Sequence, residues 1–505
     1  MRKKRIVCIT AILAVLCIAG LLFRHSYFFL HGKIYSRNTK LLDLRGSMIS
    51  VSEYNALRKK LPACEILWNI PFQGNFFPSD SQALTITILS DTDVEALRYF
   101  PALKAVNAAA CKDYSQLEQL RTQYPQLTVH YTVTIADTDY PWDCSEITIT
   151  EISPEVLSAV QHLPNLKTIH AESCTDLQGL KTLWESSSQY TVFYEVPIAG
   201  ISVAGNIETL SLKGISTDTL VEQLPYLPKL RKIMLQDPVD TAEKLRKFRA
   251  DFPQISITWQ TEILGIPVSS EDLELDLSGI ALESTDTIRQ AAQWLPNLEK
   301  VIACNCGIDN ESMATFRNEV RSQYKVVWEV SLGRRTIRTD ETWCHRNLTD
   351  KAAYNLRYCE DMVCIDLGHQ PICNLDWAAY MPNLKYLIVA DTGISDLTPL
   401  AGLQHLTYLE LFKTRAVDLT PLLSCPALED LNIGGKEIDV TPVKQITWLK
   451  RLWWLGCPVS MEELKESLPD TEIVFPQWSY TADGWREGEN YYAQRDFMGE
   501  AYMVG

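Results

Sequence analysis

The stretch Leu384-KYLIVADTGISDLTPLAGL-Gln404 decides the fold of this 505-residue chain. Its first half places apolar residues at alternate positions, which is typical of a short strand with one buried face. Its second half carries Thr398-Pro399, and a Thr that caps a helix with Pro at the first helical position favours a short helical turn. The stretch therefore predicts a strand, a turn and a short helix.

The same phrase recurs through the C-terminal region. Its leading leucines are spaced by 22, 22 and 21 residues and are Leu384, Leu406, Leu428 and Leu449. One such unit cannot bury its apolar strand face alone, whereas stacked units share a core and set their strands side by side in a parallel sheet. We therefore predict regular repeats over residues 361–475.

Residues 41–335 follow a longer and looser period. The aromatic markers of its recurring segment are 63, 63, 65 and 69 residues apart and are Trp68, Tyr131, Tyr194, Trp259 and Trp328. Alternating β-branched and aromatic residues around each marker predict a strand pair. We expect irregular repeats of roughly 64 residues, each with two leucine-type turns and a strand-rich extension that either stacks in line or projects as a hairpin.

These phrases resemble leucine-rich repeats, and the I-x-D-L-T-P-L wording is similar to the internalin-like repeats of bacterial surface proteins. The resemblance implies an α/β leucine-rich-repeat solenoid with a parallel β-sheet on its concave face and short helices or turns on its convex face. It also implies a bacterial cell-surface protein whose activity is protein binding.

The N-terminal sequence Met1-RKK-Arg5 precedes eighteen uncharged residues, 6–23. As a helix this run would be about 27 Å long, close to the thickness of a bilayer's hydrocarbon core. We predict a cytoplasmic stub and single transmembrane signal anchor at residues 1–24, a juxtamembrane linker at 25–40 and an extracellular C-terminal ectodomain at the cell membrane. Cleavage of the segment as a signal peptide is the alternative.

Charge and motif content exclude two classes of function. The formal net charge is −16, from 47 basic and 63 acidic residues, which argues against a nucleic-acid binder. The chain has no nucleophile elbow, Gly-rich phosphate loop or HExxH motif. We therefore predict neither an enzyme nor a bound cofactor or metal.

Cysteines fall into two groups. One group occupies the same inward-facing position of successive repeats and comprises Cys111, Cys174, Cys306 and Cys457, whereas Cys304 is expected to face the concave side. The other lies near the junction predicted at residues 336–360 and comprises Cys344, His345, Cys359, Cys364, His369 and Cys373. It admits a zinc site, a disulfide or a plain repeat boundary, so an accessory sensor or enzyme with a metal or thiol site near 344–373 is the alternative function.

The exposed positions of the last strands carry the predicted binding site. Side chains of a strand alternate between its two faces, so residues beside the core leucines point to the concave surface. The predicted ligand-binding residues are Tyr386, Tyr408, Glu410, Phe412, Arg451 and Trp453. Aromatic residues grouped with Arg and Glu are typical of interfaces, and the expected partner is a protein, a peptide or a cell-wall glycan. The alternative is that the aromatic cap or tail at residues 476–505 covers this face.

Overall fold

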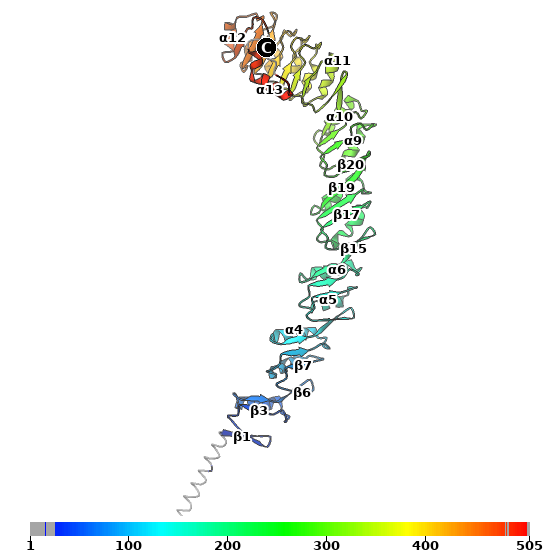
Figure 1. The fold of residues 1–505 in the computed structure, drawn as a ribbon, viewed down its shortest axis with the longest axis vertical. Coiled ribbons are helices and arrows are strands. Elements are labelled where there is room, and N and C mark those ends of the chain that lie inside the picture. The colour runs from blue at the N-terminus through cyan, green and yellow to red at the C-terminus, as the bar shows by residue number, and fades with distance from the viewer. Residues whose placement is uncertain (1–15, 17–25, 480, 482–483, 502–505) are drawn as a thin grey trace, which may run out of the picture. The chain divides into compact units, whose positions relative to one another are not determined.

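The computed structural model describes residue 16, residues 26–479, residue 481 and residues 484–501 (Figure 1). The chain divides into two compact units, the first formed by residues 1–208 and 218–230 and the second by residues 209–217 and 231–505. Apart from Leu16, the anchor predicted at residues 6–23 lies outside the described residues. Within the described ranges, no helix is both long and apolar enough to cross a membrane.

The first compact unit consists of small parallel sheets, each followed by an antiparallel hairpin. Its parallel strands are β3 (Leu41–Asp43) and β4 (Glu65–Leu67), then β7 (Ala83–Thr85), β8 (Ala105–Asn107) and β9 (Thr128–His130), then β12 (Glu146–Thr148), β13 (Thr168–His170) and β14 (Thr191–Phe193). Its hairpins are β1 (Tyr27–Leu30) with β2 (Lys33–Ser36), β5 (Asn69–Phe72) with β6 (Asn75–Pro78), β10 (Thr132–Ile135) with β11 (Thr138–Pro141), and β15 (Glu195–Ile198) with β16 (Ile201–Ala204).

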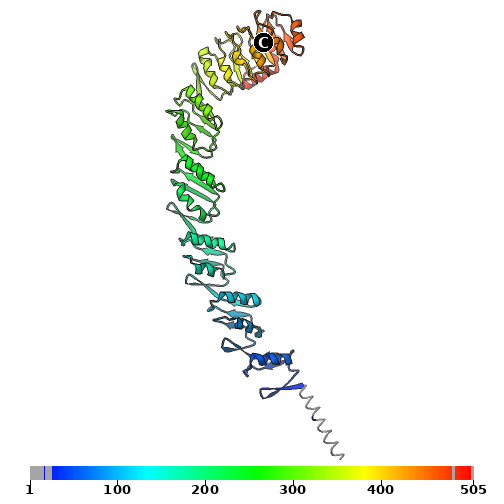
Figure 2. The same cartoon turned by 180° about the vertical axis from the view of Figure 1, so that it is seen from behind.

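Helices connect successive parallel strands of the first compact unit. They are α2 (Val51–Lys60), α3 (Asp91–Ala96), α4 (Tyr114–Gln123), α5 (Pro154–Val160) and α6 (Leu177–Ser186), with the 3-10 turn η1 (Leu97–Tyr99). The 3-10 turn η2 (Leu224–Tyr226) also belongs to this unit but follows its last strand. Most of the helices begin at a capping side chain. Ser50, for example, accepts from the backbone N–H of Glu53 while the Glu53 carboxylate accepts from the Ser50 N–H, which satisfies two otherwise unpaired helix donors. Helix α7 (Thr217–Val221) spans the boundary of the two compact units. Figure 2 shows these connecting helices along the blue-to-green part of the chain.

Two-residue turns close the hairpins. In β5–β6, Phe72 pairs with Asn75 around Gln73 and Gly74, whose φ angles are 50° and 73°. Positive φ at both central residues is the type I′ geometry that matches the twist of paired strands, and glycine adopts it without steric cost. The strand-rich extensions therefore form antiparallel hairpins. Hairpin β1–β2 lies within the linker predicted at residues 25–40.

The aromatic markers of the long repeats are buried where each parallel sheet meets its hairpin. Trp259 is 1% exposed, and its Nε1 donates to the Trp294 carbonyl at 2.9 Å. The Tyr194 hydroxyl donates to the Tyr226 carbonyl at 2.8 Å. A Cβ on Gly205 would lie 2.1 Å from the Tyr194 ring, so only glycine fits beside it. Tyr194 and Trp259 thus each link their repeat to a carbonyl more than thirty residues further along the chain.

The second compact unit continues the long repeats before changing to regular ones. Its first strands are β17 (Thr209–Lys213), β18 (Lys232–Gln236), β19 (Ser256–Ile263) and β20 (Ile266–Ser269), then β21 (Glu274–Asp276), β22 (Lys300–Ile302) and β23 (Lys325–Val327), then the hairpin β24 (Glu329–Leu332) with β25 (Arg335–Arg338). Its helices in this part are α8 (Ala242–Asp251), α9 (Thr285–Ala292) and α10 (Asn310–Val320). Small parallel sheets separated by hairpins thus form this part of the unit, within the range of the irregular repeats predicted over residues 41–335.

A seven-stranded parallel sheet forms the C-terminal part. Its strands are β26 (Trp343–His345), β27 (Cys364–Asp366), β28 (Tyr386–Ile388), β29 (Tyr408–Glu410), β30 (Asp430–Gly434), β31 (Arg451–Leu455) and β32 (Glu472–Val474). Leu387, Leu409, Leu431 and Leu452 pair in register and are fully buried. Because β26 pairs with β27, the sheet begins at Trp343, inside the junction predicted at residues 336–360. One apolar core continues from Val268 to Ile473.

Short turns connect the strands of this sheet. They are α11 (Asp350–Ala353), η3 (Tyr354–Tyr358), η4 (Asp376–Tyr380), η5 (Thr398–Leu400), η6 (Thr420–Ser424) and η7 (Val443–Gln445), with α12 (Met461–Ser467) before β32. The Thr-Pro turns are 3-10 helices rather than Thr-capped helices. The Thr398 N–H donates to the Asp396 carboxylate at 2.8 Å, and Thr420 repeats this contact with Asp418 at 2.8 Å. The Asp two residues before each Thr therefore satisfies the first N–H of the turn, while Leu397 and Leu419 occupy the N-cap positions.

Candidate functional site: strand faces of the second compact unit

The outward face of the seven-stranded sheet is covered by the chain's own C-terminal segment. The cover consists of η8 (Trp485–Glu487) and α13 (Glu489–Met498), which Figure 1 draws in red against the sheet. The buried residues of the cover and of the sheet form one apolar cluster, which includes Ile388, Tyr408, Trp453, Trp485, Tyr491 and Met498. We call this segment, residues 484–501, the cover.

Trp485 is the centre of the contact between the cover and the sheet. Its side chain is fully buried, and its ring centroid lies 5.2 Å from Tyr408 and 5.2 Å from Trp453. Its Nε1 donates to Glu410 Oε1 at 2.8 Å. One tryptophan thus fills the apolar surface of two strands and satisfies a buried carboxylate oxygen.

Arg451 holds the start of the cover from the sheet side. Its Nη2 donates to the carbonyls of Gly484 at 3.1 Å and Trp485 at 2.8 Å. Its guanidinium carbon lies 4.7 Å from the Trp453 centroid and 4.9 Å from the Trp485 centroid. A Cβ on Gly488 would lie 1.3 Å from Arg451 Nη1, so a larger residue at the start of helix α13 would displace the Arg451 side chain.

The structure answers the question of exposure for the six residues predicted to bind a ligand. Their exposed fractions are 5% for Tyr386, 0% for Tyr408, 0% for Glu410, 5% for Phe412 and 1% for Trp453, with 13% for the side chain of Arg451. All six belong to the outward face of the sheet, and the cover lies against that face, which is the alternative that the sequence left open. Ligand binding by them stays a prediction.

Charged groups are enclosed beneath the cover. Burial raises the pKa of the Glu410 carboxyl. Burial also raises the pKa of Asp430, against the opposing effect of Arg451, and the Asn490 amide donates to Asp430 at 3.1 Å. Arg495 of the cover lies 3.6 Å from Asp366 and 2.7 Å from Glu500. Charge pairing therefore adds directional contacts to the apolar ones.

The cysteines and histidines of the junction are divided between the two faces of the sheet. Cys344 and Cys359 belong to the inner core, and burial raises the pKa of each thiol to about 12. Cys364 faces the cover instead, and Cys373 is exposed. Among the described residues, no group of three or more His, Cys, Asp or Glu side chains is placed to hold a metal ion. That search covers the metal site considered for residues 344–373, and a thiol site there stays an alternative.

Repeat-position cysteines satisfy backbone groups. Cys306 Sγ donates to the Leu277 carbonyl at 3.1 Å, and Cys306 is 3% exposed. At the corresponding position of the regular repeats, the Thr392 hydroxyl donates to the Val389 carbonyl at 2.6 Å. Cys304 lies in the same loop, but Cys306 alone belongs to the inner core. The two thiols thus have different surroundings, as their spacing predicts.

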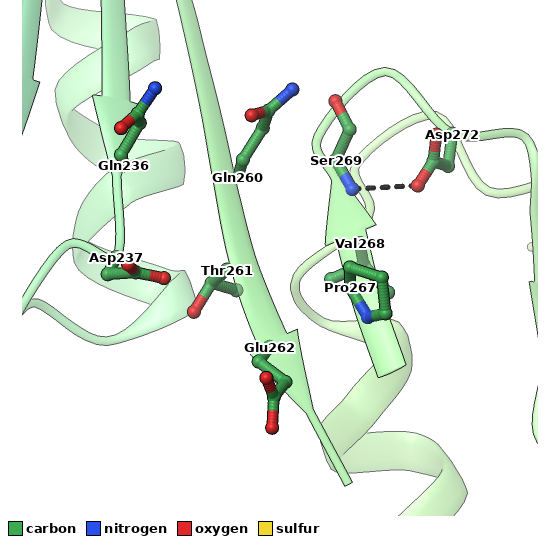
Figure 3. Close-up of a pocket in the computed structure, with 9 residues that line it drawn as sticks. All are labelled: Gln236, Asp237, Gln260, Thr261, Glu262, Pro267, Val268, Ser269 and Asp272. Atoms are coloured by element: carbon green, nitrogen blue, oxygen red, sulfur yellow. Dashed lines mark hydrogen bonds between the residues drawn. The ribbon is translucent and has the colours of Figure 1, made fainter. Parts of the chain in front are cut away.

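An open groove lies on the strand face of β17–β20. It has a volume of about 530 Å³ and is lined by Gln236, Asp237, Gln260, Thr261, Glu262, Pro267, Val268, Ser269 and Asp272. Figure 3 shows the Gln236 and Gln260 amides side by side on neighbouring strands, with Ser269 and Asp272 across from them. The Asp272 carboxylate accepts from the Ser269 N–H at 2.7 Å, and Asp237 pairs with Lys213 at 3.2 Å. Amides and carboxylates dominate this surface.

The groove was not predicted from the sequence, because the predicted binding residues came from the aromatic columns of the regular repeats. The alternation in Lys232–Gln236 and Ser256–Ile263 was the available signal, since it alternates buried and outward residues. The cover was anticipated only as an aromatic tail. Its polar members Gln494 and Arg495 are buried, which no local pattern in the sequence indicates.

Comparison with known proteins gives structural likenesses only. No family model matches the chain, and no curated protein does. An internalin (inlF) of Listeria monocytogenes is 16% identical, with 66% of this chain and 84% of that chain covered and a TM-score of 0.24. Internalin C2 of the same organism is 17% identical, with 42% and 85% covered and a TM-score of 0.22. The PEPR1–AtPEP1 structure is 12% identical, with 83% and 49% covered and a TM-score of 0.19.

TM-scores this low do not establish a common fold, so the assignment rests on the chain's own repeats. The leading leucines recur every 21 or 22 residues, and the strands that follow them pair in parallel register. Their buried leucines form a continuous core with short 3-10 turns between the strands. These features together give this part of the chain a fold of stacked strand-and-turn repeats, the architecture that its resemblance to leucine-rich repeats implies.

Proposed function

We propose that the protein is a non-enzymatic recognition scaffold that binds a protein or peptide on the open strand face of β17–β20. The groove of about 530 Å³ on that face carries the proposal. Unlike the covered sheet, this face presents its polar side chains to solvent, and its rigid strands fix their positions. Repeat proteins use such preformed surfaces for binding.

The charge of the groove indicates the chemistry of the partner. Asp237, Glu262 and Asp272 contribute carboxylates, and the whole chain has a formal net charge of −16. Lys and Arg side chains of a peptide would pair with these carboxylates, while its backbone would bond the Gln236 and Gln260 amides. A basic peptide segment therefore fits better than an acidic one. A cell-wall glycan, which would use the amides without the charges, is the alternative ligand.

Location at the cell membrane belongs to the same proposal. The uncharged run at residues 6–23, preceded by Arg2, Lys3, Lys4 and Arg5, supports a single-pass anchor with the repeats outside the cell. The internalin-like wording of the repeats supports a bacterial surface protein. A ligand at the predicted residues beneath the cover would require the cover to leave, so the groove is the primary surface.

The test measures binding of peptide pools of basic, neutral and acidic composition, and of cell-wall glycan fragments, to the immobilised protein. The wild type is expected to bind the basic pool, with affinity that falls as salt is raised. Gln260→Ala combined with Glu262→Gln should weaken that binding by about tenfold or more. Glu243→Gln on helix α8, which removes one exposed carboxylate away from the groove, is the matched control.

Two outcomes would reject the proposed surface. One is equal binding of the basic pool by the wild type, the groove variant and the control. The other is binding of the glycan fragments alone, which would transfer the function to glycan recognition. Unchanged far-UV circular dichroism in the groove variant would exclude misfolding as the cause of any loss.

A further inference from the structure

A second, smaller cavity lies between the seven-stranded sheet and the cover. Its volume is about 140 Å³. Asp366 and Glu410 line it from strands β27 and β29, and Arg486 and Arg495 line it from the cover. It is independent of the groove on β17–β20, and its lining includes two of the residues predicted to bind a ligand, Glu410 and Phe412.

Glu410 presents an unsatisfied acceptor to this cavity. The residue is fully buried, and its Oε1 accepts from the Tyr408 hydroxyl and from Trp485 Nε1. Its Oε2 is buried and has no hydrogen-bond partner. A buried carboxylate oxygen without a donor is costly, so such an atom calls for a donor from a bound molecule.

The cover presents an unsatisfied donor to the same cavity. Arg486 Nε is buried and has no hydrogen-bond partner. Arg495, beside it, is held by the Ala501 carbonyl at 2.9 Å and lies 3.6 Å from Asp366. The cavity thus combines an orphan acceptor on the sheet with an orphan donor on the cover.

Charge balance and size define the ligand class. Two carboxyl groups, Asp366 and Glu410, line the cavity together with two guanidinium groups, Arg486 and Arg495, and with the imidazoles of His345 and His369, so it offers partners to both a cation and an anion. An anion alone would leave the two carboxyl groups without a partner, and a cation alone would leave the two guanidinium groups without one. A dipolar molecule can pair with both kinds of group. At roughly 30 Å³ per water in the liquid, the space equals about four or five waters, which limits the ligand to a few non-hydrogen atoms.

We propose that this cavity binds a small zwitterion of the α-amino-acid class, with its ammonium group on Glu410 and its carboxylate on Arg486. Ile388 and Phe412 also line the cavity and leave apolar contact for a short side chain. Burial raises the pKa of Glu410, and an ammonium group bound there would favour the ionised form. The ligand would join the sheet to the cover, so binding strengthens the attachment of the cover.

Isothermal titration calorimetry on the full chain tests the site with glycine, L-alanine and L-serine. Methylamine and acetate, each with half of the zwitterion's charge, are the matched ligand controls. We expect one site per chain for at least one amino acid, and at least tenfold weaker binding of both half-molecules. Hydrogen exchange of residues 485–498 should slow when the amino acid is present.

Variants separate this site from a general effect on folding. Glu410→Gln keeps the shape and the acceptor for Tyr408 and Trp485 but places an amide where the ammonium group would bind. Glu410→Gln and Arg486→Gln should each weaken amino-acid binding about 10- to 100-fold, since each removes a charge-assisted hydrogen bond. Arg415→Gln, an exposed arginine outside the cavity, should bind as the wild type does.

The proposal is overturned if none of the three amino acids binds, or if acetate or methylamine binds as tightly as the amino acid. Equal affinity of the wild type and a folded Glu410→Gln variant would overturn it as well. Melting curves identify the folded variants.

Discussion

Two strand faces built by the same repeat phrase have opposite surroundings. On β12–β14 in the first compact unit, outward residues such as Thr168 and Thr191 are polar, and Phe193 remains 37% exposed beside His170. On β28–β31 in the second, the outward residues include Tyr408 and Trp453, which are 0% and 1% exposed beneath the cover. In these two sheets, the outward residues are mostly polar where the face is open and mostly aromatic where the cover lies on it. An aromatic column in a leucine-rich repeat is not by itself a free binding surface.

Among the substitutions considered, Trp485→Ala should lower stability the most, because Trp485 is the centre of the contact between the cover and the sheet. Removing a fully buried tryptophan leaves a cavity in the cluster and lowers the free energy of unfolding by about 3–5 kcal/mol. Trp478→Ala is the control, because Trp478 is 89% exposed and its loss should change stability by less than about 0.5 kcal/mol. Urea denaturation followed by circular dichroism measures both. Equal effects of the two substitutions would show that the cover does not pack on the sheet.

Gly488→Ala would test how closely the cover approaches Arg451. The added methyl group overlaps Arg451 Nη1, and relief of such crowding costs about 1–3 kcal/mol. The backbone at Gly488, with φ −75° and ψ 151°, accepts alanine, so the cost comes from the contact alone. In an Arg451→Ala background the same change should cost little, and a double-mutant cycle measures the difference. An undiminished cost in that background would contradict the contact.

Asp240→Asn should change how the stability of the second compact unit depends on pH. Burial raises the pKa of Asp240, but hydrogen bonds from the Thr217 N–H and Lys244 outweigh it and lower the pKa to about 2. The folded pKa lies below the ordinary 3.8, so the stabilisation is present above that value and is lost as pH falls towards 2. Between pH 5 and pH 2 the wild type should lose about 1–2 kcal/mol more than the variant, after allowance for solvent screening. Parallel denaturation curves at both pH values would contradict this.

Glu410→Gln should show the reverse dependence in the covered region. Burial holds the folded pKa of Glu410 above its ordinary 4.5, so the folded state keeps its proton where the unfolded state has lost it. This contribution is fully present below pH 4.5 and is lost as pH rises through the folded pKa. The stability of the wild type should therefore fall relative to Glu410→Gln as pH rises above 4.5. A constant difference between the two proteins from pH 4 to pH 8 would count against the burial of this carboxyl.

Phe193→Ala should have the smallest effect. The ring is partly exposed and stacks on His170 at 5.7 Å without closing a core. A surface change of this kind shifts the unfolding free energy by about 0.5 kcal/mol or less. Thermal denaturation measures it. A loss as large as that of Trp485→Ala would mean that the open face is as tightly packed as the covered one.

The sequence predicted local structure better than it predicted what covers a surface. The leucine spacing indicated the parallel sheet, because the period of each repeat fixes which side chains share its core. The aromatic markers such as Trp259 indicated strand pairs, since alternating residues need a pleated backbone. Gln73 and Gly74 are a signal for a two-residue hairpin, but the prediction left open whether the extensions form hairpins.

The candidate sites were harder to predict because they depend on contacts distant in sequence. The contact between Trp485 and Glu410 joins residues 75 positions apart, and no periodic pattern relates them. The groove on β17–β20 depends on how a hairpin folds beside a sheet, which the residue types alone leave open. The Thr-Pro turns were predicted with the wrong cap because Asp396 and Thr398 are both good capping residues, and only the backbone geometry separates them.

The order of the chain has a consequence for biosynthesis. Strands β28–β31 precede the cover, so a ribosome completes an aromatic sheet face before it makes the segment that shields it. At about 5–20 residues per second, the roughly forty residues from β31 to the end of α13 take on the order of 2–8 seconds. During this interval the nascent sheet exposes Tyr408 and Trp453, which makes it a substrate for chaperones and a target for aggregation. Trp485 thus ends a vulnerable stage of synthesis.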